Sequence, residues 1–319
     1  MKIPRETYRS PFILTSLLAL FGCGDSSSSE ALPSPEPVPD PPEAFSGSIT
    51  LSHGGLEREA IVHIPEDTPA NAPLIIVMHG YSSQASVISD YSGFIELANR
   101  ERFIVAFPQG TIDADGYAFF NVGYAFHDDV EVDDLGFIRS LVEYLQREYA
   151  AHRAHVFATG MSNGGDMSFY LACQASDLFL AYAPIAGTMM KHISDNCAPG
   201  PMQPIMAVNG TADDVTFYNG DPNNQGGWGA YLDIPSIVEF WTTRHNLSLV
   251  SAEELPNTAP NDGSTVSLER YGTGNLPDVF RLYRVNNGGH DWPGVWGNMD
   301  LQTTNEVWDF FQESIDGAQ

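Results

Sequence analysis

The sequence predicts an α/β fold with a mostly parallel central sheet flanked by helices. Two observations carry this prediction. Short continuous apolar runs recur along the chain, as expected of parallel strands that are buried on both faces. Segments with apolar residues at helical spacing lie between these runs. The alternation favours one large α/β domain, which we place at residues 45–319.

The individual elements follow from the same patterns. Residues 45–53 and 56–64 are expected to form two opening strands. Further strands are expected at residues 73–78, 103–107, 154–159, 179–185, 204–208 and 279–285. Helices are expected at residues 135–149, 166–175, 234–245 and 304–314. Asp133 or Asp134 is well placed as the N-cap of the first of these helices.

Composition limits the possible partners. The 319 residues include 41 acidic and 14 basic side chains, for a formal net charge of −27. Such a surface repels nucleic acids and anionic membranes, so neither is expected to bind it. The 43% of hydrophobic residues is enough to build a sizeable core.

The N-terminus has the pattern of an export signal. Basic residues precede an apolar run at residues 12–21, which is too short to span a membrane as a helix. The following segment, Leu20-Phe21-Gly22-Cys23, resembles the lipobox of bacterial lipoproteins. We therefore expect residues 1–22 to be a lipoprotein-type signal peptide and Cys23 to be lipidated, with ordinary cleavage as the alternative.

Residues 23–44 are rich in serine and proline and cannot build a packed core, so they are expected to act as a tether. These features predict an extracytoplasmic bacterial protein, secreted or anchored as a lipoprotein. Its contact with the membrane would be made only through the lipid.

A nucleophile elbow is predicted between an expected strand and helix, where residues 160–165 read Gly-Met-Ser-Asn-Gly-Gly. Ser162 lies at its tip. Gly160 and Gly164 flank the serine because the chain must reverse sharply there, and a Cβ would collide with neighbouring backbone.

A serine nucleophile needs a histidine as base and a carboxylate that orients the histidine. Asp213 follows the expected strand at 204–208, and His290 follows the strand at 279–285, which gives the chain order Ser, Asp, His. Asp214 is the alternative to Asp213. The oxyanion donors are expected to be the backbone N–H groups of Asn163 and of Tyr81, which follows the strand at 73–78. We expect the ring of His79 only to brace that loop.

Six motifs in order resemble the polyhydroxybutyrate depolymerase and feruloyl esterase family of secreted α/β-hydrolase esterases. They are His79-Gly80, Phe107-Pro-Gln-Gly110, Asp133-Asp-Leu-Gly-Phe137, Gly160-Met-Ser-Asn-Gly-Gly165, Gly210-Thr-Ala-Asp213 and Gly289-His-Asp-Trp-Pro-Gly294. The resemblance implies an α/β-hydrolase fold, with Ser162, Asp213 and His290 as the triad. The chain departs from the family at Asn209, where a histidine is usual, and at Thr216-Phe217, where Val-Pro is commoner.

The cysteine count agrees with export. With Cys23 assigned to lipid, Cys173 and Cys197 remain as a pair that an oxidising compartment would allow to form a disulfide. Two buried free thiols are the alternative.

Two further segments have more than one interpretation. Trp228, in the glycine-rich stretch 219–231, and Trp292 are candidate substrate-binding residues, although 219–231 also has the composition of a surface loop. The acidic run 128–134 lacks the glycine and glutamate of a calcium loop, so no metal site is expected there.

The sequence thus predicts a serine carboxylic-ester hydrolase that works through an acyl-enzyme and needs no cofactor. Its substrate would be a small or oligomeric ester, with polyester and esterified polysaccharide among the possible polymers. The alternative is a tethered, non-catalytic ligand-binding protein on the same fold.

Overall fold

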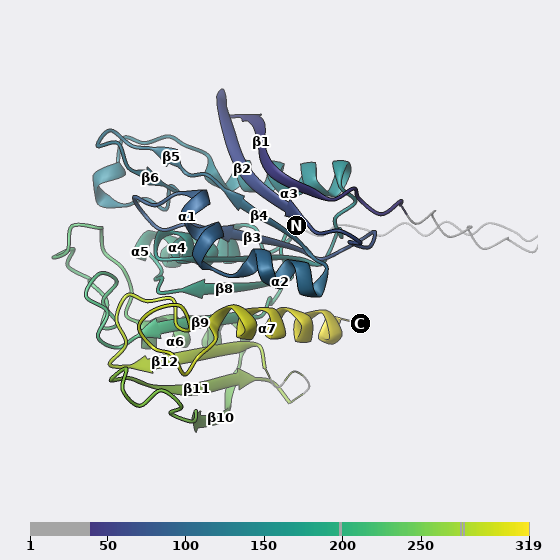
Figure 1. The fold of residues 1–319 in the computed structure, drawn as a ribbon. Coiled ribbons are helices and arrows are strands. Elements are labelled where there is room, and N and C mark those ends of the chain that lie inside the picture. Colours follow the sequence, from purple (N-terminus) through teal and green to yellow (C-terminus); the bar gives the residue numbers. More distant parts are fainter. Residues whose placement is uncertain (1–38, 198–199, 275, 277, 319) are drawn as a thin grey trace, which may run out of the picture. The chain divides into compact units, whose positions relative to one another are not determined.

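The computed structural model describes residues 39–197, 200–274, 276 and 278–318. The expected signal peptide, the lipidation site Cys23 and most of the expected tether lie outside these residues. Within the described part, the chain forms a ten-stranded sheet covered by helices on both faces (Figure 1).

The middle of the sheet is parallel, and its strands lie in the order β4 (Ile104–Pro108), β3 (Leu74–Met78), β7 (Val156–Met161), β8 (Ala181–Ile185), β9 (Ile205–Gly210) and β12 (Phe280–Asn286). Antiparallel strands extend both sides. They are β2 (Leu56–Ile64) and β1 (Phe45–His53) beside β4, and β11 (Thr265–Gly272) and β10 (Ser248–Glu254) beside β12. The predicted fold class, a mostly parallel sheet between helices, is confirmed.

Each face of the sheet packs against its own set of helices. One core contains residues of α3 (Asp134–Glu148), α4 (Asn163–Gln174), α5 (Lys191–Asp195) and α6 (Ile234–His245). The other contains residues of α1 (Ala85–Tyr91), α2 (Phe94–Glu101) and α7 (Thr303–Ala318). In the described residues, no helix is long and apolar enough to cross a membrane.

Successive side chains along each central strand point to opposite faces of the sheet, so each strand contributes apolar side chains to both cores. In β3, Leu74, Ile76 and Met78 point into the first core, whereas Ile75 and Val77 point into the second. Successive side chains of a strand face opposite sides of a sheet, so a strand buried on both sides must be apolar at every position. This is the physical origin of the continuous apolar runs in the sequence.

The expected elements are present, and the sequence patterns missed several others. The first two strands and the helix at 234–245 have the expected bounds, and the remaining expected strands and helices are found with ends shifted by a few residues. The helices α1, α2 and α5, the strands β10 and β11, the short hairpin of β5 (Thr111–Ile112) and β6 (Ala118–Phe119), and the 3₁₀ turn η1 (Ala125–His127) were not expected. The edge strand β10 is mostly exposed and polar, so its place depends on backbone pairing with β11 rather than on an apolar pattern.

The last two residues of the acidic run at 128–134, Asp133 and Asp134, make contacts that stabilise the fold. Asp133 is the N-cap of α3, where its carboxylate accepts the N–H of Gly136 at 2.8 Å. Asp134 is buried, pairs with Arg58, and accepts the N–H of Asn121 at 2.6 Å. No cluster of three or more potential metal-binding side chains occurs among the residues that are described.

A disulfide joins Cys173, near the end of α4, to Cys197, after α5, with their Cα atoms 4.8 Å apart. The predicted pairing is therefore confirmed. The bond ties the helix that follows the predicted nucleophile to the segment that leads into β9.

Replacing both Cys173 and Cys197 with alanine should lower the free energy of unfolding by roughly 3 kcal/mol, because the crosslink restricts a loop in the unfolded chain. The two cysteines are 24 residues apart. Urea unfolding followed by circular dichroism measures the change. The control is the native protein with a reductant, which should lose similar stability, while the double variant should not respond. Equal unfolding midpoints for the native and variant proteins would contradict this role.

Candidate active site

Ser162 lies at the turn between β7 and α4, with a backbone φ of 58°. This conformation is costly for a residue with a side chain and is typical of a nucleophile elbow. Its N–H donates to the carbonyl of Ile185 at 2.9 Å, which holds the turn against the end of β8. The side chain is partly exposed at the carboxyl edge of the parallel strands, where active sites of open α/β sheets lie.

The glycines around Ser162 allow a close approach of backbone. A Cβ at Gly160 would lie 2.5 Å from the carbonyl oxygen of Met78, and one at Gly164 would lie 2.1 Å from the same atom. Both distances are shorter than any real contact of a side-chain carbon, so only glycine fits. The elbow therefore packs directly on the end of β3.

The structure brings Asp213 and His290 together, as the sequence predicted. Asp213 Oδ2 lies 2.8 Å from His290 Nδ1, and the Asp213 side chain is only 2% exposed. The other carboxylate oxygen accepts the N–H groups of Val215 and Thr216 at 2.8 and 2.7 Å. These bonds aim the carboxylate at the ring, whereas the neighbouring Asp214 is exposed.

The loops that carry Asp213 and His290 are in direct contact. A Cβ at Gly210, at the end of β9, would lie 2.3 Å from the carbonyl oxygen of Gly289. No hydrogen bond joins Ser162 Oγ to His290 among the described residues. In unliganded hydrolases this bond is commonly long and shortens when the substrate binds.

The predicted oxyanion donors lie on both sides of Ser162. Asn163 is the first residue of α4, and the loop that holds Tyr81 passes close by, since a Cβ at Gly80 would be 3.2 Å from Ser162 Cβ. Within the described part of the chain, neither Asn163 nor Tyr81 uses its backbone N–H in a hydrogen bond. Both donors are therefore free to bind an oxyanion.

His79 braces the loop before Tyr81. Burial lowers the pKa of His79 to about 4, so its ring is neutral at neutral pH. Nε2 accepts the N–H of Gly110 at 2.9 Å, and the protonated Nδ1 donates to the carbonyl of Gly80 at 2.7 Å. The ring thus connects the loop after β3 to the loop after β4.

The side chain of Tyr81 is held by a buried carboxylate. Its hydroxyl donates to Asp113 Oδ2 at 2.7 Å, and His127 Nε2 lies 3.1 Å from the same oxygen. Burial raises the pKa of Asp113, but hydrogen bonds from Tyr117, Tyr81 and His127 outweigh it and lower that pKa to about 2. The ring of Tyr81 packs edge-on against Trp228, with ring centroids 5.4 Å apart.

A small cavity opens beside Ser162, with a volume of about 20 Å³. It is lined by Tyr124, Ser162, Asp166, Thr188, Met190, Val215, Thr216, Trp228 and Tyr231. A single water molecule needs about 10–15 Å³ by this measure, so the space beside Ser162 is narrow. Trp228 thus lines a cavity next to Ser162, in agreement with the first of its two interpretations.

Trp292 does not lie in the cleft, which corrects the expectation drawn from its position two residues after His290. It is fully buried in the second core, its Nε1 donates to Thr304 Oγ1 at 3.1 Å, and its ring packs against Tyr91 and Phe94. The chain turns inward after His290, so this side chain supports the loop rather than contacting substrate.

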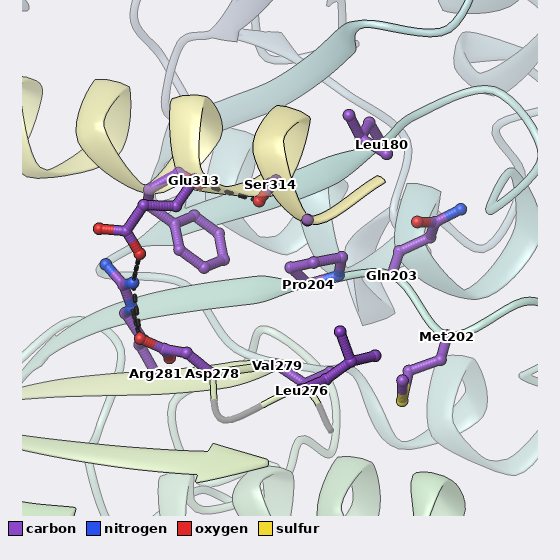
Figure 2. Close-up of a pocket in the computed structure, with 12 residues that line it drawn as sticks. Leu180, Met202, Gln203, Pro204, Leu276, Asp278, Val279, Arg281, Glu313 and Ser314 are labelled. Carbon is purple, nitrogen blue, oxygen red and sulfur yellow. Dashed lines mark hydrogen bonds and ion pairs between the residues drawn. The ribbon is translucent and has the colours of Figure 1, made fainter. Parts of the chain in front are cut away.

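The larger cavity shown in Figure 2 has a volume of about 300 Å³ and lies away from the triad. Leu180, Pro204 and Val279 line it, and each immediately precedes a strand of the parallel sheet. The triad residues instead lie at the strands' carboxyl ends. An ionic cluster of Arg281 with Asp278 and Glu313 borders the cavity.

Sequence reasoning missed two side chains of the site. The amide of Asn163 makes a pair of hydrogen bonds with the backbone of Phe120, with the N–H of Phe120 at 2.7 Å and its carbonyl at 2.9 Å. Asp166 is 3% exposed and lines the cavity beside Ser162. An acidic residue in the first turn of a helix is usually explained by the helix dipole, so no sequence signal identified it.

No protein-family model matches the chain. It is 34% identical to feruloyl esterase B of Piromyces equi over 239 residues, which cover 73% of this chain and 42% of that protein. It is 25% identical to poly(3-hydroxyalkanoate) depolymerase C of Paucimonas lemoignei over 237 residues, covering 71% of this chain and 53% of the relative. The chain thus spans about half the length of these relatives.

Among solved structures, the acetyl xylan esterase from Aspergillus awamori resembles the fold with a TM-score of 0.60 and 14% identity, covering 83% of this chain and 99% of that one. The likeness confirms the α/β-hydrolase fold. In sequence, the chain is thus similar to proteins named feruloyl esterase and poly(3-hydroxyalkanoate) depolymerase, and it shares its fold with an acetyl xylan esterase.

Proposed function

We propose that this protein is a serine carboxylic-ester hydrolase that works through an acyl-enzyme. The observation that carries the proposal is the pairing of Asp213 with His290 at the edge of the sheet where the strained elbow presents Ser162. The names of the sequence relatives, a feruloyl esterase and a poly(3-hydroxyalkanoate) depolymerase, support it. A non-catalytic binding protein would have no need of a serine in a strained conformation beside an oriented histidine.

The arrangement assigns a role to each group. Ser162 Oγ attacks the ester carbonyl carbon, and His290 Nε2 takes the serine proton while Asp213 holds Nδ1 and stabilises the positive ring. The N–H groups of Tyr81 and Asn163 bind the oxyanion. His290 then protonates the leaving alcohol. Water, activated by the same histidine, releases the acid and restores Ser162.

Replacing Ser162 with alanine should lower turnover of a short activated ester by about 10⁴ or more, because no other group forms the acyl-enzyme. Release of 4-nitrophenol from its acetate ester measures the loss. A fluorophosphonate should add one label to the native protein and none to the variant, as seen by intact mass. Native-like hydrolysis by the variant, or an unlabelled native protein, would contradict the assignment of Ser162 as the nucleophile.

The size of the cavity supports a short acyl group as the substrate's acid part. The names of similar proteins include feruloyl, hydroxyalkanoate and acetyl esters. Of these acyl groups, the acetyl group is the smallest and fits a cavity of about 20 Å³ best. We propose acetyl and similarly short esters as substrates, with a sugar, an oligomer or a polymer as the alcohol part outside the cavity.

For the native protein, kcat/KM should fall by about tenfold or more from acetate to butyrate esters, because a longer acyl group overfills the cavity. For the same reason, the protein should hydrolyse methyl ferulate with a lower kcat/KM than acetylated xylan. Met190→Ala should enlarge the cavity and raise the butyrate-to-acetate ratio. Met299→Ala, at a residue that is 41% exposed, is the matched control and should leave the ratio unchanged. Equal rates on feruloyl and acetyl esters would contradict this substrate class.

We further propose that the enzyme acts outside the cytoplasm, held to a membrane by lipid on Cys23. The lipobox-like segment that ends at Cys23 supports this location, as does the disulfide between Cys173 and Cys197, since disulfides persist in oxidising compartments. Several acyl chains on one cysteine would bind a bilayer durably.

Cys23→Ala should abolish incorporation of radiolabelled palmitate in a bacterial host and move the protein from the membrane fraction to the soluble fraction. Ser34→Ala, a change in the same segment away from the lipobox-like sequence, is the control and should leave the native distribution. An unlabelled native protein, or an equal membrane fraction for the Cys23 variant, would contradict the anchor.

A further inference from the structure

The loop that carries the predicted oxyanion donor Tyr81 has a strained backbone. Ser82, the next residue, has a φ of 62°, which is uncommon and costly for a residue with a side chain. Such strain persists only where the surrounding structure holds the chain in place. Residues 110–119 supply part of this support, and they include Asp113, a carboxylate that the mechanism above does not use.

Two hydrogen bonds join the loop to the hairpin of β5 and β6. The N–H of Ser82 donates to the carbonyl of Ala118, in β6, at 2.8 Å. The hydroxyl of Tyr81 donates to Oδ2 of Asp113, which directly follows β5, at 2.7 Å. These bonds hold two adjacent residues, one through its backbone and the other through its side chain. In the part of the chain that the structure describes, the backbone N–H of Tyr81 makes no hydrogen bond and so remains available to an oxyanion.

The carboxylate of Asp113 is itself fixed in place. Its side chain is only 4% exposed. Oδ1 accepts the N–H groups of Asp115 and Tyr117 at 3.0 and 2.9 Å, and these bonds shape the turn between β5 and β6. Oδ2 lies 3.1 Å from His127 Nε2, in addition to its bond with the hydroxyl of Tyr81. One carboxylate therefore joins the hairpin, η1 and the oxyanion loop, and it cannot turn without losing these contacts.

We propose that Asp113 is a positioning residue of the oxyanion site, because it holds the side chain of Tyr81 against the hairpin and thereby fixes the backbone N–H of Tyr81 beside Ser162. The inference rests on the proposed function. The loop passes close to the nucleophile, since a Cβ at Gly80 would lie 3.2 Å from Ser162 Cβ. A donor contributes fully only when it is aimed at the place that the oxyanion will occupy, so a small displacement of the loop weakens the bond in the transition state.

The test replaces Tyr81 with phenylalanine, which removes the hydrogen bond to Asp113 and keeps the ring and the backbone N–H. The variant should lose about tenfold in kcat with KM nearly unchanged, because the oxyanion is absent from the bound ester and forms only during the reaction. Hydrolysis of 4-nitrophenyl acetate measures both constants. Tyr271→Phe is the matched control, since Tyr271 also donates its hydroxyl to a carboxylate, that of Glu269 at 2.6 Å. It belongs to β11, and its kcat should equal that of the native protein.

A tetrahedral adduct separates an effect on the oxyanion site from an effect on stability. When trifluoroacetone binds, Ser162 Oγ adds to its carbonyl carbon, His290 takes the serine proton, and the carbonyl oxygen becomes an oxyanion. The inhibition constant should rise about tenfold in Tyr81→Phe, in parallel with the loss of kcat, and should stay unchanged in Tyr271→Phe. A purely structural role of the Tyr81 hydroxyl would lower the unfolding midpoint in urea without changing the inhibition constant.

A second variant tests the carboxylate directly. Asp113→Ala should lose at least as much kcat as Tyr81→Phe, because it removes the same bond and also the contacts that shape the hairpin. The variant with both changes should be no slower than Asp113→Ala alone, since Asp113 acts through Tyr81. A double variant that loses the product of the two single effects would contradict this route.

A kcat and an inhibition constant equal to those of the native protein in Tyr81→Phe would overturn the inference. If that variant does not fold, as judged by circular dichroism, an unchanged inhibition constant in Asp113→Ala overturns it instead. Fluorophosphonate labelling separates this failure from a failure of the proposed function. A native protein that is labelled while both constants stay unchanged refutes only the role of Asp113, whereas an unlabelled native protein refutes the esterase itself.

Discussion

The contact between the elbow and the end of β3 is the constraint on which the rest of the site depends. Gly160 and Gly164 both pack on the carbonyl of Met78, so closely that a Cβ atom on either residue would overlap the carbonyl oxygen. This packing forces the chain to turn within one residue, which places Ser162 at φ 58° and starts α4 immediately after it. It also brings the loop after β3, with the N–H of Tyr81, beside Ser162. One backbone contact therefore positions both the hydroxyl of Ser162 and the predicted oxyanion donors.

Buried polar side chains then connect the loops at this edge of the sheet. His79 links the loops after β3 and β4, Asn163 pairs with the backbone of Phe120, and Asp166 joins Tyr124 to Thr188. A buried polar group without a partner is costly, so each of these bonds restricts where its loop can lie. Loops held in this way provide a preorganised environment, which electrostatic catalysis requires. Tyr124, Met190 and Trp228 are among the residues that line the small cavity beside Ser162.

The carboxylates at the site differ from the acidic residues on the surface of the chain. The chain carries a formal charge of −27, yet Asp213 and Asp166 at this site are buried, and both accept hydrogen bonds. Asp213 contacts His290 at 2.8 Å, and Asp166 lines the cavity beside Ser162. In a poorly screened interior, the charge of Asp213 would stabilise the positive ring of His290 in the proposed acyl transfer.

The sequence by itself determined the fold class, the positions of the parallel strands along the chain, the elbow at Ser162 and the chain order Ser162, Asp213, His290. It could do so because burial of a strand on both faces and the sharp turn at Ser162 impose local residue patterns. Only the tertiary structure showed that Asp213 rather than Asp214 reaches His290, that Trp292 belongs to the core, and that Asp166 faces the cavity. It also showed the edge strand β10, which is held by backbone pairing and so leaves little trace in side-chain pattern. In each case the deciding factor is a contact between residues that are distant in sequence. Hydrophobic periodicity and turn-forming residues carry information only about residues that are close in sequence, so they could not predict these contacts.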